Sequence, residues 1–394
     1  MPASSSRSPS AAPLAPNAVI GIVGGGQLGR MSAVAAAKLG FRAHILTQDP
    51  HGPAAQVAHQ VTLGAYDDHK ALDAFARAVD VITFEFENIS ADALDCLAQH
   101  CPVRPSGAIL RTSQDRLAEK NFLSDADIPL APWMAVTHHA SLHAAAETLG
   151  FPFILKTTRN GYDGKGQARV YEASQLEAAF ASLAPHLLVA EGMVDFACEI
   201  SVMVVRGTDG TTRCFAPGLN YHRDGILDLT LAPAPVQEET AQRAQALATA
   251  IAEKLDLIGI LGVEMFIDRT GTLLVNEIAP RPHNSGHWTM DACPADQFDM
   301  HIRAVAGLPL PPALRHSDAA MKNLVGPDDM ALWPEILETP GHIPHLYGKA
   351  EARAGRKMGH VNILFPYGSL PGALGVQDAL GPLADKPETE DNDH

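Results

Sequence analysis

Residues 262–277 read GVEMFIDRTGTLLVNE, and this stretch predicts the β-hairpin on which the fold assignment rests. Apolar side chains at Val263, Met265 and Ile267 alternate with other residues, as in a strand with one buried face. Arg, Thr and Gly at 269–271 supply the turn, and a second apolar run leads back to a polar end. The polar residues at the open end of this hairpin are therefore expected to lie close together.

Glu264 and Glu277 lie roughly opposite each other if the turn centres near Thr270. Like charges that face each other across strands are destabilising, and apolar flanks add a desolvation cost. A shared divalent cation removes both problems, and two carboxylates with phosphate oxygens are a typical magnesium environment. Spacing alone leaves two alternatives open: one glutamate points to solvent, or both glutamates pair with arginines.

Two glycine-rich stretches could bind an anion through backbone amides. AVIGIVGGGQLGRM, residues 18–31, predicts a strand, a tight turn and a helix, and its G-x-G-x-x-G spacing is typical of a dinucleotide site. GYDGKGQ, residues 161–167, is not a Walker A loop, and by itself it favours an ordinary hairpin turn. Lys156, however, ends an apolar strand five residues before this loop. A strand lysine beside a flexible glycine loop is a common way to hold nucleotide phosphates.

Two polar clusters follow the hairpin. NEIAPRPHNSGHWT, residues 276–289, concentrates hydrogen-bonding side chains directly after Glu277, which suits an anionic substrate or, alternatively, a well-capped polar loop. ARAGRKMGHVN, residues 352–362, contains Arg353, Arg356, Lys357 and His360. In a chain with a formal net charge of −16, this second cluster is a candidate phosphate pocket, although a solvated basic turn is equally compatible.

The composition excludes several classes of protein. A net charge of −16 argues against a general nucleic-acid or polybasic membrane surface. No window approaches 18 unbroken apolar residues, so we expect no membrane span. The five cysteines have neither CxxC nor zinc spacing, which indicates reduced thiols and a cytoplasmic location. A Ser/Pro/Ala-rich start and an acidic end are expected to be disordered tails.

The rest of the chain predicts two kinds of sheet. In the first part, the strand candidates VIGIV, RAHILT and VDVITFEFE alternate with helix-like runs, which predicts a parallel sheet with right-handed crossovers over residues 18–115. Farther along, LLVAEGMV and EISVMVVRG begin a unit with long antiparallel signals. Its helix is expected at EETAQRAQALATAIAEKL, where apolar residues recur at helical spacing.

Eight motifs together resemble a known family. In chain order they are GGGQLGRM, TFEFENI, SQDRLAEK, TRNGYDGKGQ, NYHRDGIL, GVEMF, VNEIAPRPHNSGHWT and GRKMGHVN, spanning about residues 18 to 365. They resemble the ATP-grasp superfamily and, more closely, its N5-carboxyaminoimidazole ribonucleotide synthetase family of purine biosynthesis. GYDGKGQ is moderately specific for that family, and NEIAPRPHNSGHWT is highly specific.

The resemblance implies an α/β chain, α+β overall, with the three-part ATP-grasp fold. The expected divisions are a disordered tail at 1–17, a Rossmann-like N-terminal domain at 18–115, a linker helix and lid at 116–190, the ATP-grasp C-terminal domain at 191–313, a small C-terminal segment packing on it at 314–380, and an acidic tail at 381–394. Lys322 stands where an apolar residue is expected, and we assign it no role.

The resemblance also implies site residues by motif match. Those implied for ATP are Arg116, Lys156, Gly161, Gly164, Lys165, Gly166, Gln167, Glu191, Gly192, Met193, Val194, Glu199, His222 and Asn276. Those implied for the bicarbonate and catalytic site are Arg281, His283, Asn284, Tyr162 and Asp163. Those implied for the ribonucleotide substrate are Gln27, Ser285, Arg353, Arg356 and Lys357, and those implied for the metal are Glu264 and Glu277.

The implied reaction is the carboxylation of aminoimidazole ribonucleotide by ATP and bicarbonate through carboxyphosphate, with two magnesium ions and a homodimeric protein. On this reading the glycine turn at 24–29 approaches the ribonucleotide. One rival is another ATP-grasp ligase, such as a formate-dependent enzyme, against which RPHNSGHWT argues. The other rival is a nicotinamide-dependent oxidoreductase built on GGGQLGR and Asp49, which would leave Glu264 and Glu277 without a purpose.

Overall fold

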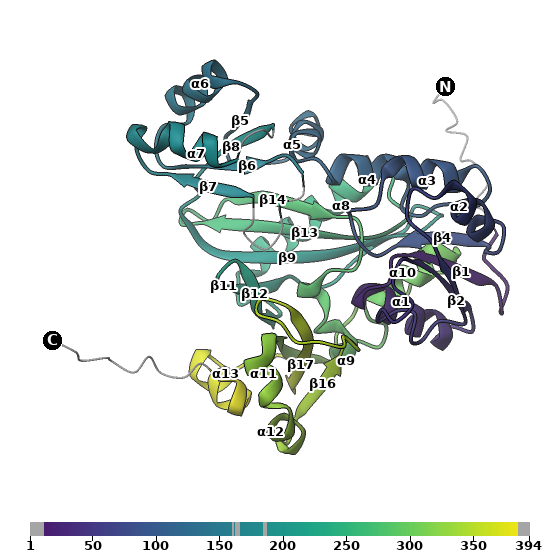
Figure 1. The fold of residues 1–394 in the computed structure, drawn as a ribbon. Helices are drawn as coiled ribbons and strands as arrows, with labels where there is room; N and C mark the ends of the chain where they lie inside the picture. The colour runs from purple at the N-terminus through teal and green to yellow at the C-terminus, as the bar shows by residue number, and fades with distance from the viewer. Residues whose placement is uncertain (1–11, 160, 162–165, 184–186, 385–394) are drawn as a thin grey trace, which may run out of the picture.

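The structure is a computed structural model that describes residues 12–159, 161, 166–183 and 187–384. Figure 1 shows three parts: an N-terminal domain on one side, a small lid, and a large central sheet that continues toward the C-terminus. The expected mixed architecture, with one parallel sheet and further antiparallel sheets, is confirmed.

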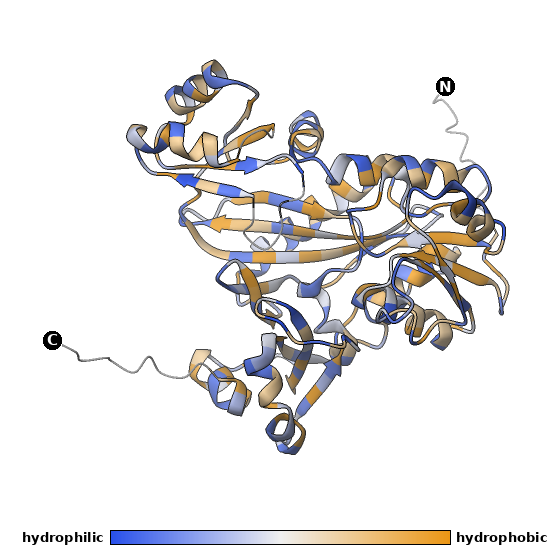
Figure 2. Ribbon diagram, in the orientation of Figure 1, coloured by the Kyte–Doolittle hydropathy of each residue, from blue (hydrophilic) through white to orange (hydrophobic). Residues whose placement is uncertain are grey.

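The N-terminal domain is a parallel sheet flanked by helices. Its strands are β1 (Val19–Val23), β2 (Arg42–Thr47), β3 (Gln60–Leu63) and β4 (Val81–Phe84), and its helices are α1 (Gln27–Lys38), α2 (His69–Ala76), α3 (Ala91–Ala98) and α4 (Gly107–Ser113). The strand order is β3-β2-β1-β4, and all these pairings are parallel. The strands are apolar along most of their length because helices cover them (Figure 2).

A linker helix and the lid follow. The helix is α5 (Arg116–Asp125), and Asp115 caps its first turn by accepting from the amides of Leu117 and Ala118. The lid has strands β5 (Trp133–Val136), β6 (Phe153–Thr157), β7 (Gln167–Val170) and β8 (Leu188–Gly192), with helices α6 (His139–Leu149), η1 (Ala173–Gln175) and α7 (Leu176–Leu183). Its antiparallel sheet runs β5-β8-β6-β7 and packs its own apolar core against α6 and α7.

The large sheet has nine strands in the described part of the chain. They are β9 (Phe196–Arg206), β10 (Thr212–Cys214), β11 (Gly218–Arg223), β12 (Ile226–Ala232), β13 (Gly259–Asp268), β14 (Leu273–Ala279), β15 (Ser317–Val325), β16 (His342–Leu346) and β17 (Lys357–Pro366). The order is β14-β13-β9-β11-β12-β15-β17-β16, with β10 on β9. The segment 314–380 is therefore not merely packed on the ATP-grasp domain as predicted, because its strands continue the same sheet.

Lys322 lies within this sheet on β15, at a position that is 4% exposed. Its ammonium contacts both carboxylate oxygens of Asp228 on β12, at 2.7 and 2.6 Å. A buried charge is tolerated when it is paired and hydrogen-bonded. This partner explains why a lysine stands where the strand pattern calls for an apolar side chain.

The remaining helices cover the large sheet and join it to the N-terminal domain. They are α8 (Glu238–Lys254), η2 (Asn284–Gly286), α9 (Thr289–Ala292), α10 (Gln297–Ala306), α11 (Gly326–Ala331), α12 (Trp333–Glu338), α13 (Ala373–Leu380) and η3 (Gly381–Leu383). Phe298 and Ile302 of α10 pack against α1 and β1 in one apolar cluster. No helix in the described residues is long and apolar enough to cross a membrane.

Two parts of the predicted tails are ordered. The amide of Leu14 donates to the carbonyl of Ala306 at 2.9 Å, and Leu14 packs beside the α1–α10 cluster. At the other end, Leu383 of η3 is 4% exposed in the core of the large unit. The prediction of a disordered tail is therefore wrong for residues 12–17, and the predicted acidic tail at 381–394 begins with the helical turn η3, because apolar side chains find a buried surface at both places. The rest of both predicted tails lies outside the described residues.

Phe298→Ala should weaken the junction between the N-terminal domain and the large unit. Phe298 is 1% exposed, and truncating a buried aromatic side chain costs about 3–5 kcal/mol because a cavity remains. Urea denaturation should show this loss in the free energy of unfolding. Val34→Ala is the matched control because Val34 lies on α1 and is 53% exposed, so its change should stay within about 0.5 kcal/mol. Equal losses in the two variants would contradict the packing argument.

Candidate active site

The two hairpin carboxylates face each other, as the spacing predicts. β13 and β14 pair Met265 with Val275 and then Glu264 with Glu277, so Asn276 is the extra residue of a β-bulge. Bulges commonly re-aim side chains near functional sites. Here the bulge moves Glu277, in place of Asn276, opposite Glu264. The prediction that Glu264 and Glu277 face each other is confirmed, but it depends on an irregularity that the spacing does not reveal.

The charges around this pair are unequal. Arg116 donates from Nη1 to Oε2 of Glu277 at 3.1 Å, so the alternative of arginine pairing holds for this glutamate. Burial alone would raise the pKa of Glu277, but nearby Arg116 and Lys156 hold that pKa below its usual value. Burial, together with the facing Glu277, raises the pKa of Glu264 to about 7. Nearby positive charge therefore compensates the carboxylate of Glu264 less than that of Glu277.

This donor set fits magnesium. In the described part of the chain, no group of three or more His, Cys, Asp or Glu side chains could hold a metal ion by itself. Magnesium usually takes one or two carboxylates and completes its shell with water and substrate phosphates. Glu264 and Glu277, whose side chains are 19% and 38% exposed, supply such a partial shell on an accessible surface.

His283 and Ser285 lie beside the carboxylates. His283 Nε2 is 3.3 Å from Glu264 Oε1, and its Nδ1 is 2.8 Å from the hydroxyl of Ser285. Burial, followed by the charge of Arg281, holds the pKa of His283 well below its usual value, so the ring is neutral. The backbone amide of Ser285 also donates to Nδ1, at 3.4 Å, so Nδ1 is the acceptor and Nε2–H faces Glu264. Ser285, predicted to bind substrate, is 1% exposed and orients His283.

Arg281 connects the site to the N-terminal domain. Its Nη2 lies 3.0 Å from Oε2 of Glu87, which follows β4. A recess of about 70 Å³ opens here, and its lining includes Arg281, Arg116, Gly161 and Glu277. Four predicted residues from three separate motifs thus meet at one cavity, between the lid, the linker helix and the large sheet.

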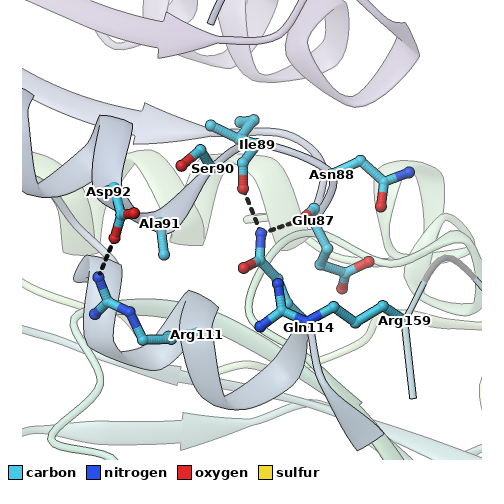
Figure 3. A pocket seen from close by; sticks show the side chains of 9 residues that line it. All are labelled: Glu87, Asn88, Ile89, Ser90, Ala91, Asp92, Arg111, Gln114 and Arg159. Atoms are coloured by element: carbon cyan, nitrogen blue, oxygen red, sulfur yellow. Dashed lines mark hydrogen bonds and ion pairs between the residues drawn. The ribbon is translucent and has the colours of Figure 1, made fainter. Parts of the chain in front are cut away.

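A larger recess of about 530 Å³ adjoins the first, because the two share Glu87, Gln114 and Arg159. Figure 3 shows its polar lining, in which Gln114 donates to the carbonyls of Glu87 and Ile89. None of the predicted site residues lines it. We therefore assign the site to the smaller recess, where the predicted charges converge.

The linker helix contributes two residues that the sequence analysis did not single out. Glu119 Oε1 accepts from the amide of Ile278 at 2.7 Å, and Lys120 Nζ donates to the carbonyl of Asn276 at 3.1 Å. The two bonded backbone groups belong to Asn276 and Ile278, the chain neighbours of Glu277. Burial raises the pKa of Glu119 to about 8. The signal was present in SQDRLAEK, because positions i, i+3 and i+4 from Arg116 share one helix face.

The lid presents a second charge cluster. Lys156 on β6 lies 3.0 Å from Glu191 on β8, and Lys120 lies 3.5 Å from the same carboxylate oxygen. Burial alone would raise the pKa of Glu191, but Lys156 and then Lys120 bring it below the usual value. The side chain of Glu191 is therefore engaged inside the protein, and Lys156 lies on the side of the lid that faces the carboxylates.

The expected adenine-binding segment is partly occupied. The amide of Gly192 donates to Pro132 and that of Met193 to Pro152, at 2.8 and 3.3 Å. The lid therefore uses both amides itself, and the expectation from the resemblance that residues 191–194 line the adenine edge with backbone groups stays a prediction.

Glu199 and His222, predicted for the nucleotide, meet across β9 and β11. His222 Nδ1 lies 2.7 Å from Glu199 Oε2. Burial alone would lower the pKa of His222, but the bond to Glu199 raises it above its usual value. Glu264 lies close enough to this pair for its charge also to raise the pKa of His222.

The glycine-rich loop is described in part. Gly166 has a left-handed φ of 72°, and a Cβ there would lie 2.6 Å from the hydroxyl of Thr157, so only glycine fits without strain. Gln167 pairs with Lys156 at the start of β7. The other predicted members of this loop, Tyr162, Asp163, Gly164 and Lys165, lie outside the described residues.

Asn284 does not offer its side chain to the site. It forms a reciprocal pair with Asn323, at 2.9 and 2.8 Å, and both residues are buried. Gln297 holds the same loop by bonding the amide and the carbonyl of His283, at 3.0 and 2.9 Å. The prediction of a direct catalytic role for Asn284 is thus not supported by its side-chain position, because its amide is used to fix the loop.

The basic cluster divides into different environments. Lys357 lies near enough to the site for its charge to lower the pKa values of His283 and Glu264. Arg353 pairs with Glu351 on the surface, and Arg356 donates to the carbonyl of Glu351. His360, which the sequence grouped with them, is fully buried against the hydroxyl of Tyr347. The prediction of one phosphate pocket is therefore wrong for His360.

The glycine turn of the N-terminal domain already binds a side chain of the protein itself, the carboxyl group of Glu85. Glu85 accepts from the amide of Gly26 through Oε1 and from that of Gly29 through Oε2, the latter at 2.8 Å. A Cβ at Gly26 would lie 2.6 Å from this carboxylate. These amides hold a pyrophosphate in dinucleotide-binding proteins, so Glu85 excludes that use. Gln27 begins α1 at the rim and is half-buried.

Known protein families match this arrangement. Models for a ribonucleotide synthetase preATP-grasp domain, an ATP-grasp domain and a phosphoribosylaminoimidazole carboxylase C-terminal domain match residues 17–114, 121–298 and 319–367. Fold and site together define an ATP-grasp ligase. The N5-carboxyaminoimidazole ribonucleotide synthase of Brucella melitensis is 49% identical over 355 residues, which cover 90% of this chain and 98% of the relative. The chain belongs to the N5-carboxyaminoimidazole ribonucleotide synthase family.

Other relatives agree. The synthase of Bacillus subtilis is 42% identical, with 89% of this chain and 92% of the relative covered. The crystal structure of the Staphylococcus aureus synthetase with ADP has a TM-score of 0.89 and 39% identity, covering 94% and 98% of the two chains. That of the Aspergillus clavatus synthase with ADP and 5-aminoimidazole ribonucleotide has a TM-score of 0.86 and 31% identity, covering 93% and 97%.

Glu85→Ala should destabilise the N-terminal domain. The change removes the acceptor for two glycine amides, and each unsatisfied buried amide costs about 1–3 kcal/mol. The free energy of unfolding in urea should fall by about 2–4 kcal/mol, given that a water molecule can replace part of the lost bonding. Glu239→Ala, at an exposed position of α8, is the charge-matched control and should lose less than about 1 kcal/mol. Equal stability of both variants would refute the capping role.

Proposed function

We propose that this chain carboxylates 5-aminoimidazole ribonucleotide with ATP and bicarbonate, giving N5-carboxyaminoimidazole ribonucleotide, ADP and phosphate. The observation that carries the proposal is the facing pair Glu264 and Glu277, with Arg116 on one carboxylate and neutral His283 on the other. Family membership supports the choice of substrate. The related Aspergillus clavatus structure contains ADP and 5-aminoimidazole ribonucleotide.

The first step is phosphoryl transfer. An oxygen of bicarbonate attacks the γ-phosphorus of ATP, the bond from that phosphorus to the β-phosphate oxygen breaks, and carboxyphosphate and ADP result. Charge on the transferring group needs fixed cations. Arg116 and Lys156 supply these from the linker helix and the lid. Magnesium held by Glu264 and Glu277 would neutralise phosphate oxygens, and we propose two ions, as the family resemblance implies.

The second step joins carbon to nitrogen. Carboxyphosphate, or the carbon dioxide that it releases, bonds to the exocyclic amine, while phosphate leaves and the amine loses one proton. Arg281 lies at the recess with its guanidinium against Glu87, and we propose that it holds the anionic reactants. His283 is fixed beside it through Ser285 and Gln297. By motif match, Tyr162 and Asp163 are proposed to reach this site from the lid loop.

The ribonucleotide is proposed to lie between the N-terminal domain and the basic loop. Gln56 donates to the carbonyl of Gly348 at 2.7 Å, which brings the 348–357 loop beside the glycine turn of α1. Lys357 and Gln27 could then meet one substrate from two sides. The other cluster members, Arg353 and Arg356, are proposed for its phosphate. A homodimer and a cytoplasmic location also remain proposals.

An assay of the purified chain tests the reaction. With ATP, magnesium, bicarbonate and 5-aminoimidazole ribonucleotide, ADP should form at a rate that depends on the ribonucleotide and on bicarbonate. Replacing bicarbonate with formate, and the ribonucleotide with glycinamide ribonucleotide, tests the rival ATP-grasp ligases. Ribonucleotide-independent ADP formation alone, or turnover only with a rival substrate, would overturn the proposal.

Glu277→Gln should abolish turnover in a folded protein. The amide keeps the size of the side chain but removes the charge that faces Arg116 and the proposed metal. Loss of one electrostatic contact to a transition state typically costs 10²- to 10³-fold in kcat, and we expect a loss on the order of 10³. Circular dichroism should show an unchanged fold. A folded variant with near-normal kcat would rule out the metal role.

A further inference from the structure

Strand β14, which carries Glu277, is the edge of the large sheet. The side of β14 that faces away from β13 contacts the linker helix α5 and the residues directly after it. The amide of Val275 donates to the carbonyl of Pro129 at 2.8 Å, and Leu130 forms an isolated parallel bridge with Val275. Beyond Val275 this segment no longer accompanies the strand. Exposed edge groups are normally paired or covered. Here two side chains of α5, whose position above the sheet can be followed in Figure 1, bond to the backbone of β14.

The side chains of α5 bond to the backbone of β14 at the bulge. Lys120 donates to the carbonyl of Asn276, the bulged residue, at 3.1 Å, and Glu119 accepts from the amide of Ile278 at 2.7 Å. The backbone is thus held immediately before and immediately after Glu277. Arg116, one turn earlier on the same helix, contacts the Glu277 carboxylate itself. One helix face therefore fixes both the backbone and the side chain of this residue.

We propose that Glu119 and Lys120 are positioning residues for the metal carboxylate: they hold the bulge at Asn276 and so keep Glu277 opposite Glu264. This inference rests on the metal role assigned to the two glutamates in the proposed function. Without the bulge the ladder would place Asn276 opposite Glu264, and only one carboxylate would face the cation.

The burial of the two side chains supports a specific task. Glu119 is 2% exposed and Lys120 is fully buried. Burying a carboxyl group and an ammonium costs free energy that apolar packing would avoid. Both side chains form hydrogen bonds with the backbone of the two residues next to Glu277. Lys120 also lies 3.5 Å from Glu191 in the lid. The helix thereby connects the lid strand β8 to the bulge through a single ammonium.

The test compares nucleotide binding with and without metal. Isothermal titration calorimetry gives the Kd for ADP in EDTA and in excess magnesium, and their ratio measures the gain due to the metal. Removing a residue that orients a metal ligand typically costs 10- to 100-fold in metal affinity. In Glu119→Leu and Lys120→Met, this ratio should fall about 10-fold or more, while the Kd in EDTA stays within about 3-fold.

Two further variants make the result specific. Glu119→Gln keeps a carbonyl oxygen that can accept from Ile278, so its ratio should return to within about 3-fold of the unmodified chain. Asp125→Leu alters an exposed position at the end of the same helix and should leave the ratio unchanged. If Glu119→Leu does not fold, Lys120→Met and Glu119→Gln still provide the comparison.

The outcomes separate this inference from the proposed function. A lowered ratio in Lys120→Met and Glu119→Leu, with rescue in Glu119→Gln, supports positioning even if the unmodified chain fails to carboxylate the ribonucleotide. Variants that lose thermal stability but keep the full ratio would overturn the inference and leave the carboxylation untouched. An unmodified chain in which magnesium gives no gain would overturn both this inference and the metal role of Glu277.

Discussion

The site depends on one electrostatic conflict: two carboxylates held face to face on adjacent strands. Such a pair is unfavourable in an empty hairpin, and the protein relieves only half of it by pairing Glu277 with Arg116. Glu264 keeps a raised pKa and a neutral histidine neighbour. The structure is therefore arranged so that added positive charge, together with phosphate, completes what the folded chain leaves unbalanced.

The surrounding elements are best understood as supports for that pair. The linker helix holds Glu277 at the edge of the sheet, and Gln297 of α10 holds the loop that carries His283. Asn284 and Asn323 lock the same loop through a buried reciprocal bond. A motif comparison would assign Arg281, Asn284 and Ser285 alike to substrate. In the structure Arg281 lines the recess, whereas Asn284 and Ser285 hold the loop of His283 in position.

The sequence could predict what is local. Alternation and turn residues predicted the hairpin, and the facing glutamates followed from its approximate centre. The bulge at Asn276 could not be predicted, because one extra residue leaves the apolar alternation nearly unchanged. Glu85 was missed for a different reason: it lies 56 residues from Gly29, and no local pattern announces which carboxylate fills a glycine turn. The joining of β15 to β12 is equally non-local.

The continuous sheet from β14 to β16 constrains how the enzyme can move. Glu277 stands on its first strand, and Lys357 begins β17 near the far side, so hydrogen-bonded ladders connect the two without a break. A sheet with this many paired strands bends little compared with a domain joined by a linker. Glu264, Glu277 and Lys357 consequently belong to one continuous frame of paired strands. The lid, by contrast, has a separate sheet and its own apolar core, so Lys156 belongs to a different packing unit from the two glutamates.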